Sequence, residues 1–328
     1  MRQSPSFLAA AAGSAADGSP AVVQLPTNPA AWINSQPLSN EMLAGKTAYL
    51  YFFEEGCPSC VRRWPELMEA AKKFTGKPIV FIAVNSGTAR RDVQLYVDEV
   101  HVTWPVIVDE DRSFEKALGV DPMISLQNIY QATALMPDGR WQDTSTDIAG
   151  TAPGLLTDAK WRVEPSEVPD LLKSAWLQVE FGNFNGAAML VKRNLQSPKS
   201  DVKAAAEKLQ AAVTKERDTD LAAAKTADEG GRKWDAYKKY QALVVRFKSY
   251  DVPADAHASI RTLAVDPAVR NELAANKLWE SAARQFSPTA PPSKGATAAL
   301  QRIVTQHPDT EAARNAQAVL DRAATPGQ

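Results

Sequence analysis

The chain has 328 residues, a length that predicts two or three domains of ordinary size. It carries 37 basic and 38 acidic residues, and a formal net charge of −1 argues against a dedicated nucleic-acid binder, which would be strongly basic. Two cysteines and three scattered histidines exclude a disulfide-stapled miniprotein and a zinc site built from local spacing. No apolar run approaches the length of about 18 residues that a membrane helix needs, so we expect no integral membrane span.

The first 24 residues allow two interpretations. They hold one arginine, a short apolar stretch from Phe7 to Ala12, and then small residues. That stretch is shorter than the apolar region of a secretory signal. Residues 1–24 are therefore either a remnant of an export signal or a disordered tail rich in Ala, Ser and Gly.

Residues 25–147 alternate between strand-like and helix-like patterns. Apolar aromatic or β-branched runs indicate strands, and apolar positions three or four apart indicate helices. In chain order we expect a strand at 46–53, a helix at 60–74, a strand at 78–84, a helix at 89–100, a strand at 104–109, a short helix at 111–118, and a hairpin of 129–136 with 140–144 around Pro137-Asp138-Gly139. This alternation predicts an α/β domain whose central sheet is covered by helices on both faces.

The remainder of the chain changes character. Residues 148–166 contain Gly, Pro, Asp and Ser in a pattern that predicts a linker. Residues 167–328 are Ala-rich with helical spacing and predict an all-α domain. Segments beginning near Gly182, Arg232 and Lys294 each consist of a helix, a break and a second helix, which favours stacked helix-pair repeats. Three unrelated helical hairpins in a bundle remain the alternative.

The cysteines form the motif Cys57-Pro58-Ser59-Cys60, directly after a predicted buried strand and at the start of a predicted helix. A helix N-terminus presents unpaired backbone N–H groups and the positive end of the helix dipole, which favour a thiolate. Pro58 suits the first helical position, where its missing N–H costs no hydrogen bond. We therefore interpret Cys57 as the nucleophile and Cys60 as the thiol that resolves the mixed disulfide.

Other interpretations of the cysteine pair stay open. It would form half of a metal site if a second pair of ligands existed, but the sequence shows none nearby, so we expect no metal. An inert structural pair is the remaining alternative. Acidic Glu54 and Glu55 oppose a thiolate, whereas basic Arg62 and Arg63 favour one, and the sequence leaves the sign of their sum undecided.

Residues 25–147 resemble the thioredoxin-like family, in its TlpA/ResA-type branch of exported bacterial thiol–disulfide oxidoreductases. The features that carry this resemblance are Trp32, Pro37-Leu38, Gly45-Lys46, the Cys57/Cys60 pair, Pro65, and the turn at residues 136–140. The helical region resembles tetratricopeptide-like segments of bacterial envelope proteins, with less specific motifs. The resemblance implies a thioredoxin-like fold over 25–147, followed by a helical-repeat-like domain over 167–328.

The same resemblance implies the activity and the surroundings of the protein. It implies thiol–disulfide exchange in the bacterial periplasm or cell envelope, with Pro58 and Ser59 setting the redox poise. The family's substrate-docking cis-proline corresponds to Tyr130 or Gln131, and neither residue is proline. No cofactor is expected beyond the redox-active disulfide, because the two sulfurs carry the electrons. The expected partners are protein thiols or disulfides, an upstream dithiol donor or acceptor, and a protein bound by the helical domain.

Two other functions remain as alternatives. In the first, the protein is an interaction scaffold whose thioredoxin-like domain is a docking module with weak or vestigial redox activity. In the second, it is a redox sensor in which oxidation changes contacts with the helical domain. The sequence does not decide whether the protein would act as a reductant or as an oxidant.

Overall fold

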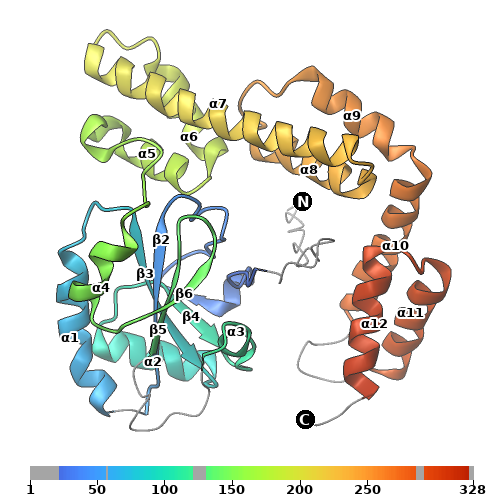
Figure 1. The fold of residues 1–328 in the computed structure, drawn as a ribbon, viewed down its shortest axis with the longest axis horizontal. Coiled ribbons are helices and arrows are strands. Elements are labelled where there is room, and N and C mark those ends of the chain that lie inside the picture. The colour runs from blue at the N-terminus through green and yellow to red at the C-terminus, as the bar shows by residue number, and fades with distance from the viewer. Residues whose placement is uncertain (1–21, 57, 121–130, 286–291, 325–328) are drawn as a thin grey trace, which may run out of the picture. The chain divides into compact units, whose positions relative to one another are not determined.

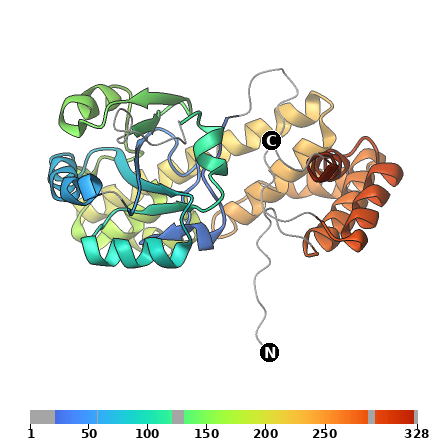
Figure 2. The same cartoon turned by 90° about the horizontal axis from the view of Figure 1, so that it is seen from below.

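The computed structural model describes residues 22–56, 58–120, 131–285 and 292–324. The chain divides into two compact units, one up to Gly182 and the other from Asn183 onward. Each unit is described by itself, and Figures 1 and 2 show the elements of both.

The first unit is built on one mixed sheet of six strands. The strands are β1 (Trp32–Ile33), β2 (Thr47–Phe53), β3 (Ile79–Ser86), β4 (Val106–Asp109), β5 (Gln131–Leu135) and β6 (Trp141–Thr144). Their order in the sheet is β1-β4-β3-β2-β5-β6. Strands β2, β3 and β4 are parallel, whereas β1, β5 and β6 run antiparallel to their neighbours. The predicted strands are confirmed with shifts of one or two residues at their ends, and β1 is a short strand that the sequence did not indicate.

Helices cover both faces of this sheet, as the alternating pattern predicted (Figure 1). The helices are α1 (Pro58–Lys72), α2 (Arg90–Val100), α3 (Ser113–Ala117) and α4 (Ile148–Leu155), preceded by the 3₁₀ turn η1 (Pro29–Ala31). Right-handed crossovers from β2 through β3 to β4 place α1 and α2 on the same face, and α4 joins them there. Helix α3 and the segment before β2 pack on the opposite face.

Strand β2 is buried along its whole length. Its residues Tyr49, Tyr51 and Phe53 face the helices α1 and α2, whereas Ala48, Leu50 and Phe52 face the other way. Alternate side chains of a strand point to opposite faces, so a central strand with both faces covered needs apolar residues at every position. The aromatic run of β2 meets that requirement.

The hairpin between β5 and β6 turns at the predicted residues. Gly139 has a φ of 86°, a conformation that glycine adopts without steric cost. The carboxylate of Asp138 accepts a hydrogen bond from the backbone N–H of Arg140, and the N–H of Met136 donates to the carbonyl of Arg140 across the turn. The Pro-Asp-Gly signal is therefore confirmed.

The linker expected over 148–166 is wrong in its first half, because residues 148–155 form α4. The carboxylate of Asp147 caps this helix by accepting a hydrogen bond from the N–H of Gly150. Side chains of Ile148, Ala152 and Leu155 lie in the core beside α1. Their spacing is that of one helical face, and it outweighs the glycines and the proline that suggested a linker.

The boundary between the two units lies after Gly182, later than the helical domain expected from residue 167. Residues 165–180 form the 3₁₀ turns η2 (Pro165–Glu167) and η3 (Asp170–Leu172) and the helix α5 (Lys173–Glu180). The carboxylate of Glu180 lies 3.0 Å from the ammonium of Lys46, and neither side chain is exposed to solvent. This carboxylate also accepts hydrogen bonds from the backbone N–H groups of Arg162 and Val163. Residues 156–182 therefore complete the first unit.

The second unit is entirely helical in its described residues, as predicted. Its helices are α6 (Phe184–Asn194), α7 (Ser200–Glu229), α8 (Lys233–Arg246), α9 (Ala254–Ala264), α10 (Pro267–Ala283), α11 (Lys294–Gln306) and α12 (Glu311–Ala324). Consecutive helices pack on each other, and α10 also contacts α8 and α12. The three expected helix pairs correspond to α6/α7, α8/α9 and α11/α12. The additional helix α10 accounts for the wider spacing before the third pair, and tetratricopeptide-like repetition stays a prediction.

A polar cluster ties α8, α10 and α12 together. The carboxylate of Glu311 accepts hydrogen bonds from Trp234 Nε1 at 2.7 Å and from Lys238 Nζ at 2.6 Å. The backbone N–H of Glu311 donates to the buried carboxylate of Glu272. Burial raises the pKa of Glu272, an effect that outweighs this hydrogen bond.

None of the helices over the described ranges is long and apolar enough to cross a lipid bilayer.

The buried Lys46–Glu180 pair yields a stability prediction. Replacing Glu180 with Gln leaves an uncompensated buried ammonium, which costs about 3–5 kcal/mol of unfolding free energy. Urea denaturation of the full chain, followed by far-UV circular dichroism, measures this loss. The control is Glu69→Gln, which removes an ion pair to Lys72 whose side chains are 68% and 71% exposed and costs about 0.5 kcal/mol or less. Equal effects of the two variants would contradict the structural role given to Glu180.

Candidate functional site

The cysteine motif lies at the carboxyl end of the central strand. Strand β2 ends at Phe53, and α1 begins at Pro58, the first helical position that the sequence assigned to this proline. Cys57 falls outside the described residues, while Pro58 and Ser59 lie in the first turn of α1. Cys60 is fully buried and disulfide-bonded, and the only other cysteine of the chain is Cys57.

An aromatic cluster holds the turn of α1 that follows Cys60. Trp64, one turn further along the helix, is fully buried and packs edge-on against Tyr51, Phe53 and Trp104. Its indole Nε1 donates a hydrogen bond to the hydroxyl of Tyr96 at 3.0 Å. Trp64 is thus a core residue, and it holds the N-terminal turn of α1 against the carboxyl end of β2.

The carboxylate of Glu55 is held at this same edge of the sheet. Its Oε2 accepts hydrogen bonds from Thr88 Oγ1 at 2.7 Å and from Asn85 Nδ2 at 3.1 Å. Asn85, the fully buried penultimate residue of β3, also donates to the carbonyl of Phe53 at 3.2 Å. Burial alone would raise the pKa of Glu55, but the hydrogen bonds from Thr88 and Asn85, with the nearby charge of Arg112, lower that pKa below its usual value.

The neighbouring Glu54 has a different environment. Its carboxylate lies 3.1 Å from the guanidinium of Arg112, which also contacts Glu115 at 3.1 Å. Burial raises the pKa of Glu54 and outweighs the opposing effect of Arg112. Glu54 therefore has a cationic partner, whereas the direct hydrogen-bond donors to Glu55 are neutral.

The basic residues after Cys60 have separate contacts. The guanidinium of Arg63 donates to the carbonyl of Thr146 at 3.1 Å and to its hydroxyl at 2.9 Å, which connects α1 to the segment after β6. Arg62 is exposed on the surface of α1.

One of the two residues expected to dock substrate, Gln131, lies on β5. The other, Tyr130, falls outside the described residues. Gln131 is the first residue of β5 and pairs with Phe52 of β2. Because β5 runs antiparallel to β2, the start of β5 meets the end of β2, and Gln131 lies at the edge of the sheet where the cysteine motif begins.

Asn85, Thr88 and Arg112 are site residues that the sequence analysis missed. Each lies within four residues of the carboxyl end of β3 or β4, at the edge shared by the parallel strands. Ligands and reacting groups gather at the carboxyl edge of parallel strands, so the predicted strand ends carried a usable signal. Among the described residues no group of three or more His, Cys, Asp or Glu side chains is arranged to hold a metal ion.

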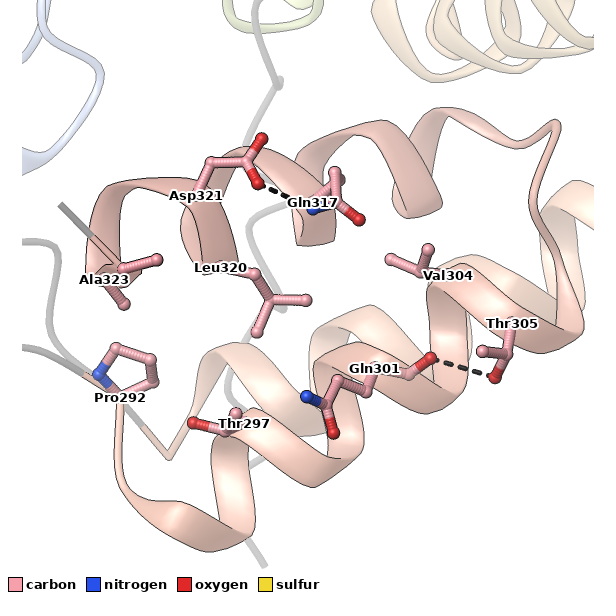
Figure 3. Close-up of a pocket in the computed structure, with 10 residues that line it drawn as sticks. Pro292, Thr297, Gln301, Val304, Thr305, Gln317, Leu320, Asp321 and Ala323 are labelled. Atoms are coloured by element: carbon pink, nitrogen blue, oxygen red, sulfur yellow. Dashed lines mark hydrogen bonds between the residues drawn. The ribbon is translucent and has the colours of Figure 1, made fainter.

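A groove also opens in the second unit, between α11 and α12 (Figure 3). Its volume is about 610 Å³, and it is lined by aliphatic side chains such as Val304 and Leu320 together with Gln301, Gln317 and Asp321. Gln317 Nε2 donates a hydrogen bond to Asp321 Oδ1 at 2.7 Å. This lining holds no cysteine or histidine, so the groove offers no site for the exchange chemistry.

Comparison with known proteins bears on the first unit. Residues 19–137 match the protein family described as Redoxin. The thiol-disulfide oxidoreductase ResA of Bacillus subtilis is 28% identical over 90 residues, which cover 27% of this chain and 50% of that protein. ResA of Halalkalibacterium halodurans is 28% identical over 81 residues, 25% of this chain and 46% of that protein. The chain thus spans about half the length of the curated relatives it matches.

Solved structures with a similar fold cover the same part of the chain. Mycobacterium tuberculosis dsbF is 21% identical with a TM-score of 0.33, over 39% of this chain and 95% of that one. A thiol-disulfide isomerase from Corynebacterium glutamicum is 20% identical with a TM-score of 0.35, over 44% and 99%.

The six-stranded mixed sheet, the match to Redoxin and the similarity to ResA agree over one region. The first domain of this chain has a thioredoxin-like fold and is similar to TlpA/ResA-type thiol–disulfide oxidoreductases.

Proposed function

We propose that the protein is a thiol–disulfide oxidoreductase that uses Cys57 and Cys60. One observation carries this proposal: Cys60 is buried and disulfide-bonded in the first turn of a helix that follows the central strand of a thioredoxin-like sheet. Helix N-termini lower thiol pKa values and so favour the nucleophilic thiolate. The activity of the matched ResA proteins, stated in their name, supports the same reaction.

The roles of the two cysteines follow from burial. Cys60 has no exposed surface, so a protein substrate cannot reach it first, and Cys57 is the attacking residue. In the reducing direction, the Cys57 thiolate attacks a substrate disulfide and displaces one substrate sulfur as a thiolate. The Cys60 thiolate then attacks the Cys57 sulfur and releases the second substrate sulfur. Two electrons pass to the substrate, its two sulfurs take up protons, and the protein is left with an internal disulfide.

Pro58 and Ser59 separate the two sulfurs, and we assign them a role in setting the redox poise. Gln131, together with Tyr130, is the proposed docking position for the backbone of the substrate, because β5 begins beside the end of β2. Neither residue is proline.

The proposed setting is an oxidising compartment of the bacterial cell envelope. An upstream dithiol donor or acceptor protein would reset the cysteine pair after each turnover. The helical domain would bind a partner protein or present substrates to the first domain. These assignments rest on the resemblance to exported TlpA/ResA-type proteins.

Cysteine substitutions test the reaction. We expect Cys57→Ser to lose exchange with a glutathionylated peptide by a factor of 10³ or more, because a hydroxyl is not a nucleophile at neutral pH. Cys60→Ser should still react once and then accumulate a mixed disulfide at Cys57, visible as a mass increase of one peptide when glutathione leaves or of one glutathione when the peptide leaves. The control is Ser59→Ala, which keeps both sulfurs and should retain turnover. Full turnover by either cysteine variant would contradict the assigned roles.

Arg112 holds the loops around the motif, and Gly87 gives it room. Gly87 has a φ of 84°, and a Cβ at this residue would lie 2.5 Å from Arg112 Nε. Because the guanidinium bridges Glu54 and Glu115, a side chain at residue 87 would push it off the loop that leads to Cys57. Residue 87 must therefore adopt a left-handed backbone conformation and leave space for the guanidinium of Arg112, and glycine meets both requirements.

Gly76 supplies a matched control for this position. It has a φ of 80°, but an added Cβ would meet nothing within 4 Å. We expect Gly76→Ala to cost about 1 kcal/mol of unfolding free energy from backbone strain and to leave the exchange rate unchanged. Gly87→Ala should cost more and should slow exchange several-fold. Urea denaturation and the peptide assay measure both quantities, and identical behaviour of the two variants would refute the role of Arg112.

Truncation tests whether the first domain suffices for exchange. We expect residues 22–182 to be folded and to retain the exchange rate of the full chain, because they contain the whole site and the buried Lys46–Glu180 pair. Residues 22–147 lack α4 and Glu180 and should unfold at much lower urea concentration. Loss of exchange in a folded 22–182 fragment would instead favour the interaction-scaffold alternative, in which the helical domain is essential.

A further inference from the structure

The two adjacent carboxylates before the cysteine motif differ in how their charge is compensated. The guanidinium of Arg112 forms an ion pair with Glu54. Glu55 has no salt bridge within 4.0 Å in the part of the chain that the structure describes, and its direct donors are the neutral Thr88 and Asn85. These hydrogen bonds keep the carboxylate ionised at neutral pH while leaving its full negative charge in place.

Covalent geometry places this charge close to the nucleophile. Glu55 precedes Cys57 by two residues, so their Cα atoms lie within about 7 Å of each other. The buried side chain of Asn85 anchors both the carboxylate of Glu55 and the carbonyl of Phe53, which restricts how far the carboxylate can move. A fixed anion near a thiol opposes its ionisation, against the effect of the helix N-terminus.

We propose that Glu55 is a redox-tuning residue that disfavours the Cys57 thiolate and thereby favours the disulfide form of the pair. The inference rests on the proposed function and extends it to a direction of electron flow. A dithiol whose thiolate is disfavoured is the stronger reductant, so the charge of Glu55 shifts the pair toward reduction of disulfide-bonded proteins. The two electrons of the dithiol pass to the substrate disulfide, and the protons end on the two substrate sulfurs.

Other titratable and charged groups face Glu55 from the neighbouring elements. Arg112 and Glu54 lie in the adjoining loops, and Tyr96 faces Glu55 from α2. Arg112 attracts Glu55, but its charge is shared between Glu54 and Glu115. The group of Glu54, Glu55, Glu115 and Arg112 thus keeps a net negative charge beside the motif when all four are ionised.

The test compares disulfide stability among four full-length proteins: wild type, Glu55→Gln, Glu55→Asp and Glu66→Gln. Each is equilibrated in glutathione buffers at pH 6 and pH 8.5. Glu66 is an exposed residue of α1 six positions after Cys60, or about 9 Å along the helix, and controls for the loss of one negative charge. Glu55→Asp keeps the charge while shortening the side chain.

We expect Glu55→Gln to destabilise the disulfide against glutathione about threefold to tenfold at pH 8.5, where a tenfold change is 29.6 mV toward a more oxidising potential. At pH 6, well below the ordinary thiol pKa of about 8.5, the charge of residue 55 acts on a smaller thiolate population, so the change should be smaller than at pH 8.5 and stay below about twofold. Glu55→Asp and Glu66→Gln should stay within about twofold of wild type at both pH values. Alkylation of Cys57 across pH should show its thiol pKa lowered in Glu55→Gln.

Two outcomes overturn the inference alone. One is an unchanged disulfide stability in Glu55→Gln at pH 8.5. The other is an equal change at pH 6 and pH 8.5, which would mean that Glu55 acts by holding Asn85 and Thr88 in place. A wild-type protein that forms no reversible disulfide would overturn the proposed function itself, and the inference with it.

A measurement on the wild type covers the case in which Glu55→Gln does not fold. Raising the ionic strength from 0.1 M to 1 M shortens the Debye length from about 10 Å to about 3 Å and weakens the action of a partly exposed charge such as that of Glu55. The wild-type disulfide should then become less stable at pH 8.5 and change less at pH 6. No effect of salt at pH 8.5 would count against the proposal.

Discussion

The complete burial of β2 is the constraint on which the first domain depends. A strand with both faces covered must lie at the centre of the sheet, and its neighbours β3 and β5 must pair with it along most of its length. The chain leaves β2 at the edge of the sheet that is formed by the carboxyl ends of the parallel strands. That edge is where the cysteine motif begins, where β3 and β4 deliver Asn85 and Arg112, and where Gln131 starts β5. The position of the site is thus a consequence of where β2 ends.

Local patterns predicted most of the first domain because each element is consistent with its neighbours. The aromatic run of β2, the Pro-Asp-Gly turn and the Cys-Pro-Ser-Cys helix start each have a single good conformation. The contacts of Glu54 and Glu55 were beyond reach, because they depend on which loops the sheet order brings together. Residues 85 and 55 are 30 apart in sequence, and no spacing rule connects them.

The error at the domain boundary has the same origin. The composition of residues 148–166 predicts a linker because it is typical of turns. Composition does not show which distant residues a segment contacts. Glu180 lies more than a hundred residues from Lys46, yet this pair is fully buried with its charge compensated on both sides. Lys46 also lies over the rings of Trp161 and Phe181, so its aliphatic stem and its ammonium are both enclosed by residues 161–181. Only a three-dimensional contact shows that this segment belongs to the sheet.

The electrostatics of the site depend on a difference between two neighbouring carboxylates. Glu54 is paired with Arg112, whereas Glu55 accepts hydrogen bonds from neutral donors. A helix N-terminus at Pro58 favours a thiolate, and its effect falls off within the first turn. The acidic pair before the motif acts over a similar distance and in the opposite sense, so neither contribution alone determines how readily the Cys57 thiol ionises. Because Arg112 is committed to Glu54 and Glu115, the balance rests on Glu55, whose neutral donors stabilise its charge without cancelling it. A fold that begins a helix at the cysteine motif can be adjusted in this way by one anchored carboxylate outside the Cys-x-x-Cys motif.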